Sequence, residues 1–152
     1  MIRLAVPVAI AFAASQTMAE TLCDPLADTM ACPPILGCVG DTGRWFRGFV
    51  SGYDEGPVEV GFDDGTSCSG QSSPDESLGV GVIEMSCSDG DRIILLHFYE
   101  DLHSDTVISR GETRDRTVVR GWAGFDAPRY LADEENGAGA RALCGSLPEL
   151  DW

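Results

Sequence analysis

Apolar and polar residues alternate in short runs along the middle of the chain. Val58, Val60 and Phe62 alternate with Glu59 and Gly61, as expected of a strand with one buried and one solvated face. Similar runs, rich in β-branched and aromatic residues, follow at regular intervals and predict further short strands. These predicted strands cover residues 45–53, 80–87, 93–96, 106–109 and 117–122.

Gly and Asp separate the runs and predict tight turns between the strands. Asp63-Asp64-Gly65 and Asp89-Gly90-Asp91 are turn sequences, because Gly adopts a positive φ at little cost. The run 93–96 is apolar on both faces, so we expect it to be a central strand. The pattern therefore predicts a mainly β fold, a small antiparallel β-sandwich or barrel of about six or seven short strands.

The two ends of the chain break this pattern. Residues 20–43 hold three cysteines and Pro33-Pro34, which predicts an irregular, disulfide-rich N-terminal cap before an antiparallel β domain over 44–125. After it, Asp126 and Pro128 favour the start of a short helix, as cap and first-turn residue. We expect that helix to span 129–135 and to stop at Asn136-Gly137, with the tail of segment 126–152 packing back through Cys144.

The first 19 residues predict export. Arg3 precedes an apolar run over 4–14, and Thr17-Met18-Ala19 offers small residues for signal-peptide cleavage. The apolar run has 11 residues, whereas a membrane-spanning helix needs roughly 20. Leu22 precedes Cys23 where lipoprotein processing requires a small residue, so we expect no lipid anchor. The alternative is an ordinary buried N-terminal helix or strand.

Charge narrows the range of partners. The whole chain carries a net charge of −15 and no lysine, and removal of Arg3 with the signal peptide makes the remainder −16. Such a surface repels nucleic-acid phosphates and anionic lipids, so we expect neither as a partner. A basic protein is the partner that this charge favours.

The cysteines predict a disulfide framework. All six follow residue 19, and an even number in an exported chain indicates three bridges. Cys68 and Cys87 each lie beside an Asp-Gly turn on strands that flank the loop 70–79, so antiparallel pairing predicts a Cys68–Cys87 bridge. Three pairings remain open for the other four cysteines, and the preferred one joins Cys32 to Cys38 and Cys23 to Cys144.

The only two histidines lie close together in the sequence with several acids. His97, Asp101, His103 and Asp105 are residue types that bind zinc or copper. On one continuous strand the two histidines would be about 20 Å apart, so a shared metal requires a turn between them. The alternative is a strand end and hairpin with solvated polar residues.

Arginines cluster between residues 110 and 120. On an extended strand Arg114, Arg116 and Arg120 point the same way, and guanidinium groups bind carboxylate, sulfate or phosphate in bidentate fashion. These three residues form a candidate site for an anionic small ligand. The alternative is internal ion pairing with Glu112, Asp115 and the acidic turns.

No motif identifies a catalytic residue or a cofactor. The chain lacks a Gly-x-Ser-x-Gly elbow, a His-Glu-x-x-His pair and a phosphate-binding loop. We therefore expect a non-enzymatic, exported binding or inhibitor-like module for a protein or small ligand. Two alternatives stay open: a small hydrolase or metal-dependent enzyme using His97 and His103, and a purely structural domain.

Overall fold

A computed structural model of the chain describes Cys23 and residues 32–52, 55–77 and 79–149. The predicted signal peptide, 1–19, lies outside these described residues. No helix within the described part is long and apolar enough to cross a membrane.

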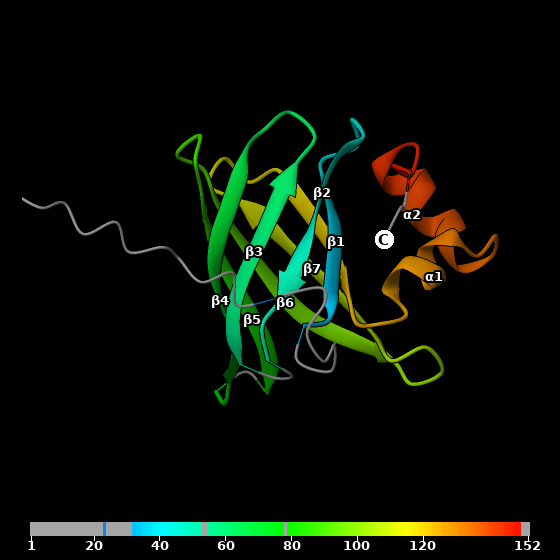
Figure 1. Cartoon of the computed structure of the whole chain (residues 1–152), viewed down its shortest axis with the longest axis horizontal. Coiled ribbons are helices and arrows are strands. Elements are labelled where there is room, and N and C mark those ends of the chain that lie inside the picture. The colour runs from blue at the N-terminus through cyan, green and yellow to red at the C-terminus, as the bar shows by residue number, and fades with distance from the viewer. Residues whose placement is uncertain (1–22, 24–31, 53–54, 78, 150–152) are drawn as a thin grey trace, which may run out of the picture.

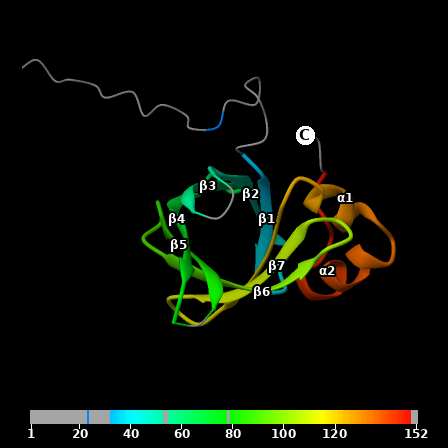
Figure 2. The same ribbon diagram turned by 90° about the horizontal axis from the view of Figure 1, so that it is seen from below.

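The described chain folds into a closed barrel of eight antiparallel strands (Figures 1 and 2). Each strand pairs with its neighbour in sequence, and β8 pairs with β1 to close the ring. The mainly β, antiparallel class predicted from alternation is confirmed, and the architecture is a barrel. The strands are β1 (Pro34–Val39), β2 (Arg44–Val50), β3 (Gly56–Phe62), β4 (Ser67–Asp75), β5 (Val80–Cys87), β6 (Arg92–Asp101), β7 (Thr106–Thr113) and β8 (Val118–Ala123).

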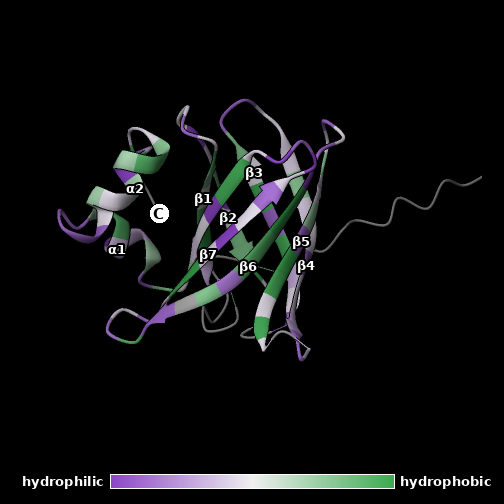
Figure 3. Ribbon diagram, turned by 180° about the vertical axis from the view of Figure 1, so that it is seen from behind, coloured by the Kyte–Doolittle hydropathy of each residue, from purple (hydrophilic) through white to green (hydrophobic). Residues whose placement is uncertain are grey.

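Alternating side chains fill the inside of the barrel. On β3, Val58, Val60 and Phe62 point inward and are buried, while Glu59 and Gly61 face solvent. Figure 3 shows the same alternation of apolar (green) and polar (purple) residues along several strands. The inward residues of the other strands complete a single core, which includes Ile35, Phe46, Ile83, Met85, Ile93, Leu95 and Val119.

A second core lies outside the barrel. Helices α1 (Ala127–Ala132) and α2 (Asn136–Cys144) lie outside the ring of strands, on the side of β1 (Figure 2). Trp45 and Trp122 stack there with ring centroids 6.0 Å apart, and Leu36 and Leu131 are fully buried in the same cluster. The helices thus cover strands that would otherwise expose large apolar side chains.

The predicted helix differs from the observed pair. Pro128 lies in the first turn of α1 as expected, but the side chain of Asp126 makes no capping hydrogen bond. Asn136 begins α2 instead of ending a helix, because Asp133 Oδ1 accepts hydrogen bonds from the backbone N–H groups of Glu135 and Asn136. At Gly137 a Cβ would lie 2.0 Å from the carbonyl oxygen of Leu131, so glycine is needed for the two helices to meet.

One strand, β1, was missed by the sequence pattern, and another, β4, extends well beyond the strand expected at Cys68. β1 lies within the segment expected to be an irregular cap, and it is buried on both faces, so it has no alternation. β4 occupies most of the segment expected to be a loop, and its inward positions carry only Cys68, Gly70 and Ser72. The run 93–96 is not central, because a closed barrel gives every strand an outer face; Leu96 is 38% exposed.

The disulfides follow the barrel geometry. Cys68 and Cys87 are direct cross-strand partners and are bonded, as the sequence predicts. The preferred pairing of the other four cysteines is wrong, because the observed bridges are Cys23–Cys32 and Cys38–Cys144. Cys32 precedes β1 and Cys38 lies near its far end, about 20 Å away along an extended strand, which is too far for a bridge. Three disulfides indicate an oxidising environment.

Candidate functional site

The two ends of the barrel differ in construction. One end, which we call the turn end, is made of the four hairpin turns 40–43, 63–66, 88–91 and 114–117. The other end, which we call the mouth, is bounded by the β2–β3, β4–β5 and β6–β7 connections, the start of β1 and the end of β8. A cavity of about 550 Å³ opens at the mouth, within the usual size range of small-molecule sites. Its inward wall includes Val50, Ser72, Gly81, His97, Val107 and Ala123.

Small side chains leave the space at the mouth. On β5 the inward residue at the mouth is only Gly81, two positions before the larger inward residue Ile83, and on β8 the inward residue at the mouth is only Ala123. The ring of His97 lies against Gly81, so that a Cβ added there would be 3.0 Å from His97 Cδ2. Gly81 therefore makes room for an imidazole in the wall of the cavity.

His97 lies in the wall of the cavity on β6. Ile93 and Leu95 on the same strand point into the barrel and are buried. His97 comes two residues after Leu95, so its side chain also points inward. Its Nε2 is buried without a hydrogen-bond partner among the described residues, and so is Oγ of Ser109, its direct cross-strand partner. Burial lowers the pKa of His97 below its usual value, so the ring is neutral at neutral pH.

The register changes immediately after His97. The pairing of β6 with β7 shifts between His97 and Tyr99, so Phe98 is the extra residue of a bulge. Phe98 is 63% exposed and lines the cavity, as does Phe125, which is 43% exposed. The bulge thus places an aromatic side chain at the edge of the mouth.

Three carboxylates line the outer part of the cavity. Glu100 comes from the end of β6, Asp105 from the β6–β7 turn and Asp126 from the residue before α1. None of their side chains has a hydrogen bond or ion pair within the described part of the chain. The residues lining the cavity include no arginine, so its charge is negative.

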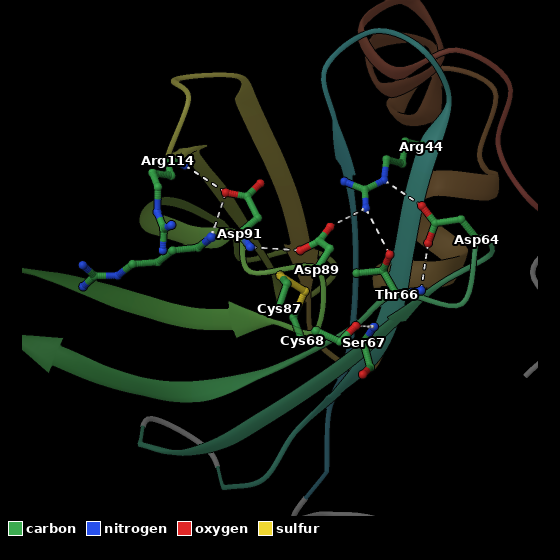
Figure 4. Close-up of a disulfide and its surroundings, with 11 residues drawn as sticks. Arg44, Asp64, Thr66, Ser67, Cys68, Cys87, Asp89, Asp91 and Arg114 are labelled. Carbon is green, nitrogen blue, oxygen red and sulfur yellow. Dashed lines mark hydrogen bonds and ion pairs between the residues drawn. A yellow bond between two sulfur atoms is a disulfide. The ribbon is translucent and has the colours of Figure 1, made fainter.

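The turn end is closed by Arg44 and the acids around it (Figure 4). Its guanidinium group lies 4.2 Å from the centre of the Phe62 ring, and its Nε is 3.0 Å from Asp64 Oδ2. Its Nη2 donates to Thr66 Oγ1 and lies 3.3 Å from Asp89 Oδ2. Hydrogen bonds from the Thr66 backbone and hydroxyl, and then from Arg44, lower the pKa of Asp64 to about 2.

The predicted arginine cluster is divided between a strand and a turn. Arg120 lies on β8 directly opposite Arg110 on β7, whereas Arg114 and Arg116 are in the turn that joins these strands. Nη1 of Arg120 lies 3.5 Å from the carbonyl oxygen of Leu143. The alternative of internal ion pairing is not seen: among the described residues no guanidinium group of these arginines pairs with a carboxylate, although the backbone N–H of Arg114 donates to Asp91 Oδ1. An anion site here remains a hypothesis.

The four candidate metal ligands are spread over β6 and the turn that follows it. His97 is in the wall of the cavity, whereas His103 is exposed in the turn, where its backbone N–H donates to Asp101 Oδ1. Asp105 lines the mouth with a φ of +46°. Over the described residues no three His, Cys, Asp or Glu side chains come together as a metal site requires.

Sequence reasoning named His97 and Asp105 but placed them in a different kind of site. Glu100, Asp126 and the two phenylalanines come together only because the barrel closes and brings β8 beside β1 and β7. One signal was present in the sequence: a histidine takes the next inward position after Ile93 and Leu95 on the same strand.

Comparisons with known proteins found no match: no family model matches the chain, and neither a curated protein nor a solved structure matches it.

Proposed function

We propose that this chain is an exported, non-enzymatic binding protein that takes a small organic ligand into the mouth of its barrel. Export is supported by the signal-peptide pattern of residues 1–19 and by the three disulfides. The binding role is supported by the cavity itself and by the polar atoms in and beneath its wall.

The observation that carries this proposal is the buried, unpartnered Nε2 of His97 beside an open cavity. A buried polar atom without a hydrogen bond costs about 1–3 kcal/mol, so folded proteins keep few of them. Among the described residues the others are Ser109 Oγ, beside His97, and Trp45 Nε1, in the second core. His97 Nε2 itself has almost no exposed surface, so a ligand recovers that cost only where the His97 side chain turns to meet it. The apolar wall residues and the two phenylalanines supply the contact area that a small ligand needs.

Binding is favoured over catalysis by the surroundings of His97. No hydrogen bond joins its ring to a serine, threonine or carboxylate side chain in the described chain. Nucleophilic catalysis by a side chain relies on such a pair, with the base in turn oriented by a third group. The cavity at the mouth has polar and aromatic side chains that can contact a ligand, but His97 is not hydrogen-bonded to a nucleophile or a carboxylate among the described residues.

A screen for mouth ligands tests the proposal. A diverse library of small organic compounds is added to the ¹⁵N-labelled, disulfide-intact protein, and backbone amide shifts are recorded. We expect at least one compound to shift the amides of His97, Val107 and Ala123, which line the cavity on β6, β7 and β8. Compounds that move only amides outside the mouth, or no binding at all, would contradict the proposal.

A matched pair of variants separates mouth binding from binding elsewhere. Val107→Trp places a large ring in the cavity, whereas Ile94→Trp makes the same change at a half-buried position of β6 that does not line it. We expect the first variant to abolish the shifts caused by each ligand and the second to keep them. Thermal unfolding of both variants establishes that each is folded.

A further inference from the structure

We propose that the ligand of the mouth is an organic cation, an ammonium group carried by an apolar body. This inference rests on the proposed function, because it names the chemical class of the molecule that the cavity takes. It is argued from the charges and rings that line the mouth.

The first argument is charge. Glu100, Asp105 and Asp126 reach the cavity from three separate segments, and no lining residue carries a positive side chain at neutral pH. The chain has no lysine, and no described arginine lies within ion-pair distance of these three acids. Carboxylates of one sign around a cavity concentrate cations there and exclude anions.

The second argument is the contrast with the acids of the turn end. There Asp64 and Asp89 share Arg44, and Asp63 lies 3.6 Å from Arg47. The chain therefore places arginines beside acids at the turn end, and it places none in the mouth. An unneutralised set of acids around a cavity leaves a place for a cation from outside.

The third argument is the pair of exposed rings. Phe98 and Phe125 line the cavity together with the acids and are 63% and 43% exposed. The face of an aromatic ring attracts organic ammonium ions and also covers apolar groups. A purely inorganic ion would use neither property, and in the described residues no set of three ligands is grouped for a metal.

The imidazole of His97 fits the same ligand. It is neutral at neutral pH because burial lowers its pKa, so it does not repel a cation. Its ring nitrogen can accept a hydrogen bond from an ammonium N–H when the other nitrogen carries the proton. The other polar side chains that line the mouth with His97 are the carboxylates of Glu100, Asp105 and Asp126 and the hydroxyls of Ser72 and Ser104.

Three molecules of one shape test the inference: 3-phenylpropan-1-amine, 3-phenylpropan-1-ol and 3-phenylpropanoate. Their affinities for the full, disulfide-intact protein are measured by calorimetry at low salt, and the site of each is located from amide shifts. We expect the amine to bind in the mouth about tenfold more tightly than the alcohol, and the carboxylate not to bind. Added salt should weaken the amine selectively.

Matched triple variants identify the acids responsible. The variant Glu100→Gln, Asp105→Asn, Asp126→Asn removes the three charges of the mouth. The control Asp41→Asn, Glu112→Gln, Glu134→Gln removes three exposed charges that do not line it. We expect the mouth variant to lose about tenfold in affinity for the amine and the control to lose less than about twofold.

The outcomes separate this inference from the proposed function. Equal binding of the alcohol or the carboxylate in the mouth would overturn the cation inference and leave the binding function standing. An unchanged affinity in the mouth variant would also overturn it. If none of the three molecules binds, the inference is contradicted, whereas the binding function is judged by the library screen and the Val107→Trp variant.

Discussion

The two ends of the barrel differ in whether their polar side chains have partners. At the turn end the guanidinium of Arg44 has three polar partners and a ring beneath it, and Asp64 accepts hydrogen bonds from Thr66. At the mouth the carboxylates of Glu100 and Asp126 and the Nε2 of His97 have no partner among the described residues. The same strands run through both ends, so the difference arises from the side chains that each end carries, such as Arg44 on β2 and His97 on β6. Among the described residues, the turn end pairs its polar groups with one another, and the mouth leaves several of its polar groups without an internal partner.

Removing the disulfide near the turn end should have the largest effect on stability. The bridge Cys68–Cys87 closes a loop with a sequence separation of 19 residues, and its loss in Cys68→Ala, Cys87→Ala should lower the free energy of unfolding by about 3 kcal/mol. Denaturant unfolding measures this loss. Binding at the mouth should be unchanged below the unfolding transition, and a parallel loss of binding would contradict the independence of the two ends.

Removing the charge of Arg44 should have the next largest effect. Arg44→Met keeps an apolar stem over Phe62 but loses the partners at Asp64, Thr66 and Asp89, so we expect a loss of about 1–2 kcal/mol. Arg47→Met is the matched control, because Arg47 is half exposed and pairs only with Asp63 at 3.6 Å. Its loss should be under about 0.5 kcal/mol. Equal losses of unfolding free energy in the two variants would mean that the contacts of Arg44 with Asp64, Thr66 and Asp89 do not stabilise the turn end.

The two ends should respond to acid in different pH ranges. The pKa of His97 is lowered in the folded protein, so protonation favours unfolding, and stability falls as the pH drops below the unfolded value of about 6.5. His97→Gln should remove this part of the pH dependence, and His103→Gln, at an exposed position, should not. Denaturant midpoints between pH 7.5 and 5 measure it.

The turn end should respond only at lower pH. The pKa of Asp64 is about 2 in the folded protein and close to 4 in an unfolded chain, so its contribution is present above pH 4 and is lost as the pH falls toward 2. Asp64→Asn should flatten the stability curve in that range and leave the range near pH 6 unchanged. This is the smallest expected effect, because the carboxyl is exposed to solvent.

The contrast between the ends also explains what the sequence predicts well. The turn end is local: Asp63-Asp64-Gly65 and Asp89-Gly90-Asp91 specify turns by themselves, and they bring Cys68 and Cys87 together. The strand Val80–Cys87 has the predicted bounds, because alternation and flanking turns agree there. The sequence pattern therefore predicted the turns, the disulfide and the strand that depend on residues close together in the chain.

The mouth depends on contacts between distant segments. β1 is buried on both faces and β4 is rich in serine, so neither shows the alternation that identifies a strand. Without them the closure of the barrel, the pairing of Cys38 with Cys144 and the grouping of Asp126 with Glu100 do not follow from local pattern. The helices bury the outer face of β1, and this contact between distant segments leaves no alternation of apolar and polar residues in the sequence of the strand.

The side-chain nitrogens of His97 give the most direct test that the mouth is a binding site. Their ¹⁵N frequencies report protonation, tautomer and hydrogen bonding, and His103 is an exposed internal reference in the same spectrum. During titration with 3-phenylpropan-1-amine at neutral pH, we predict that the His97 nitrogens shift in step with calorimetric saturation while those of His103 stay still. Saturable binding with unchanged His97 nitrogens would contradict the account.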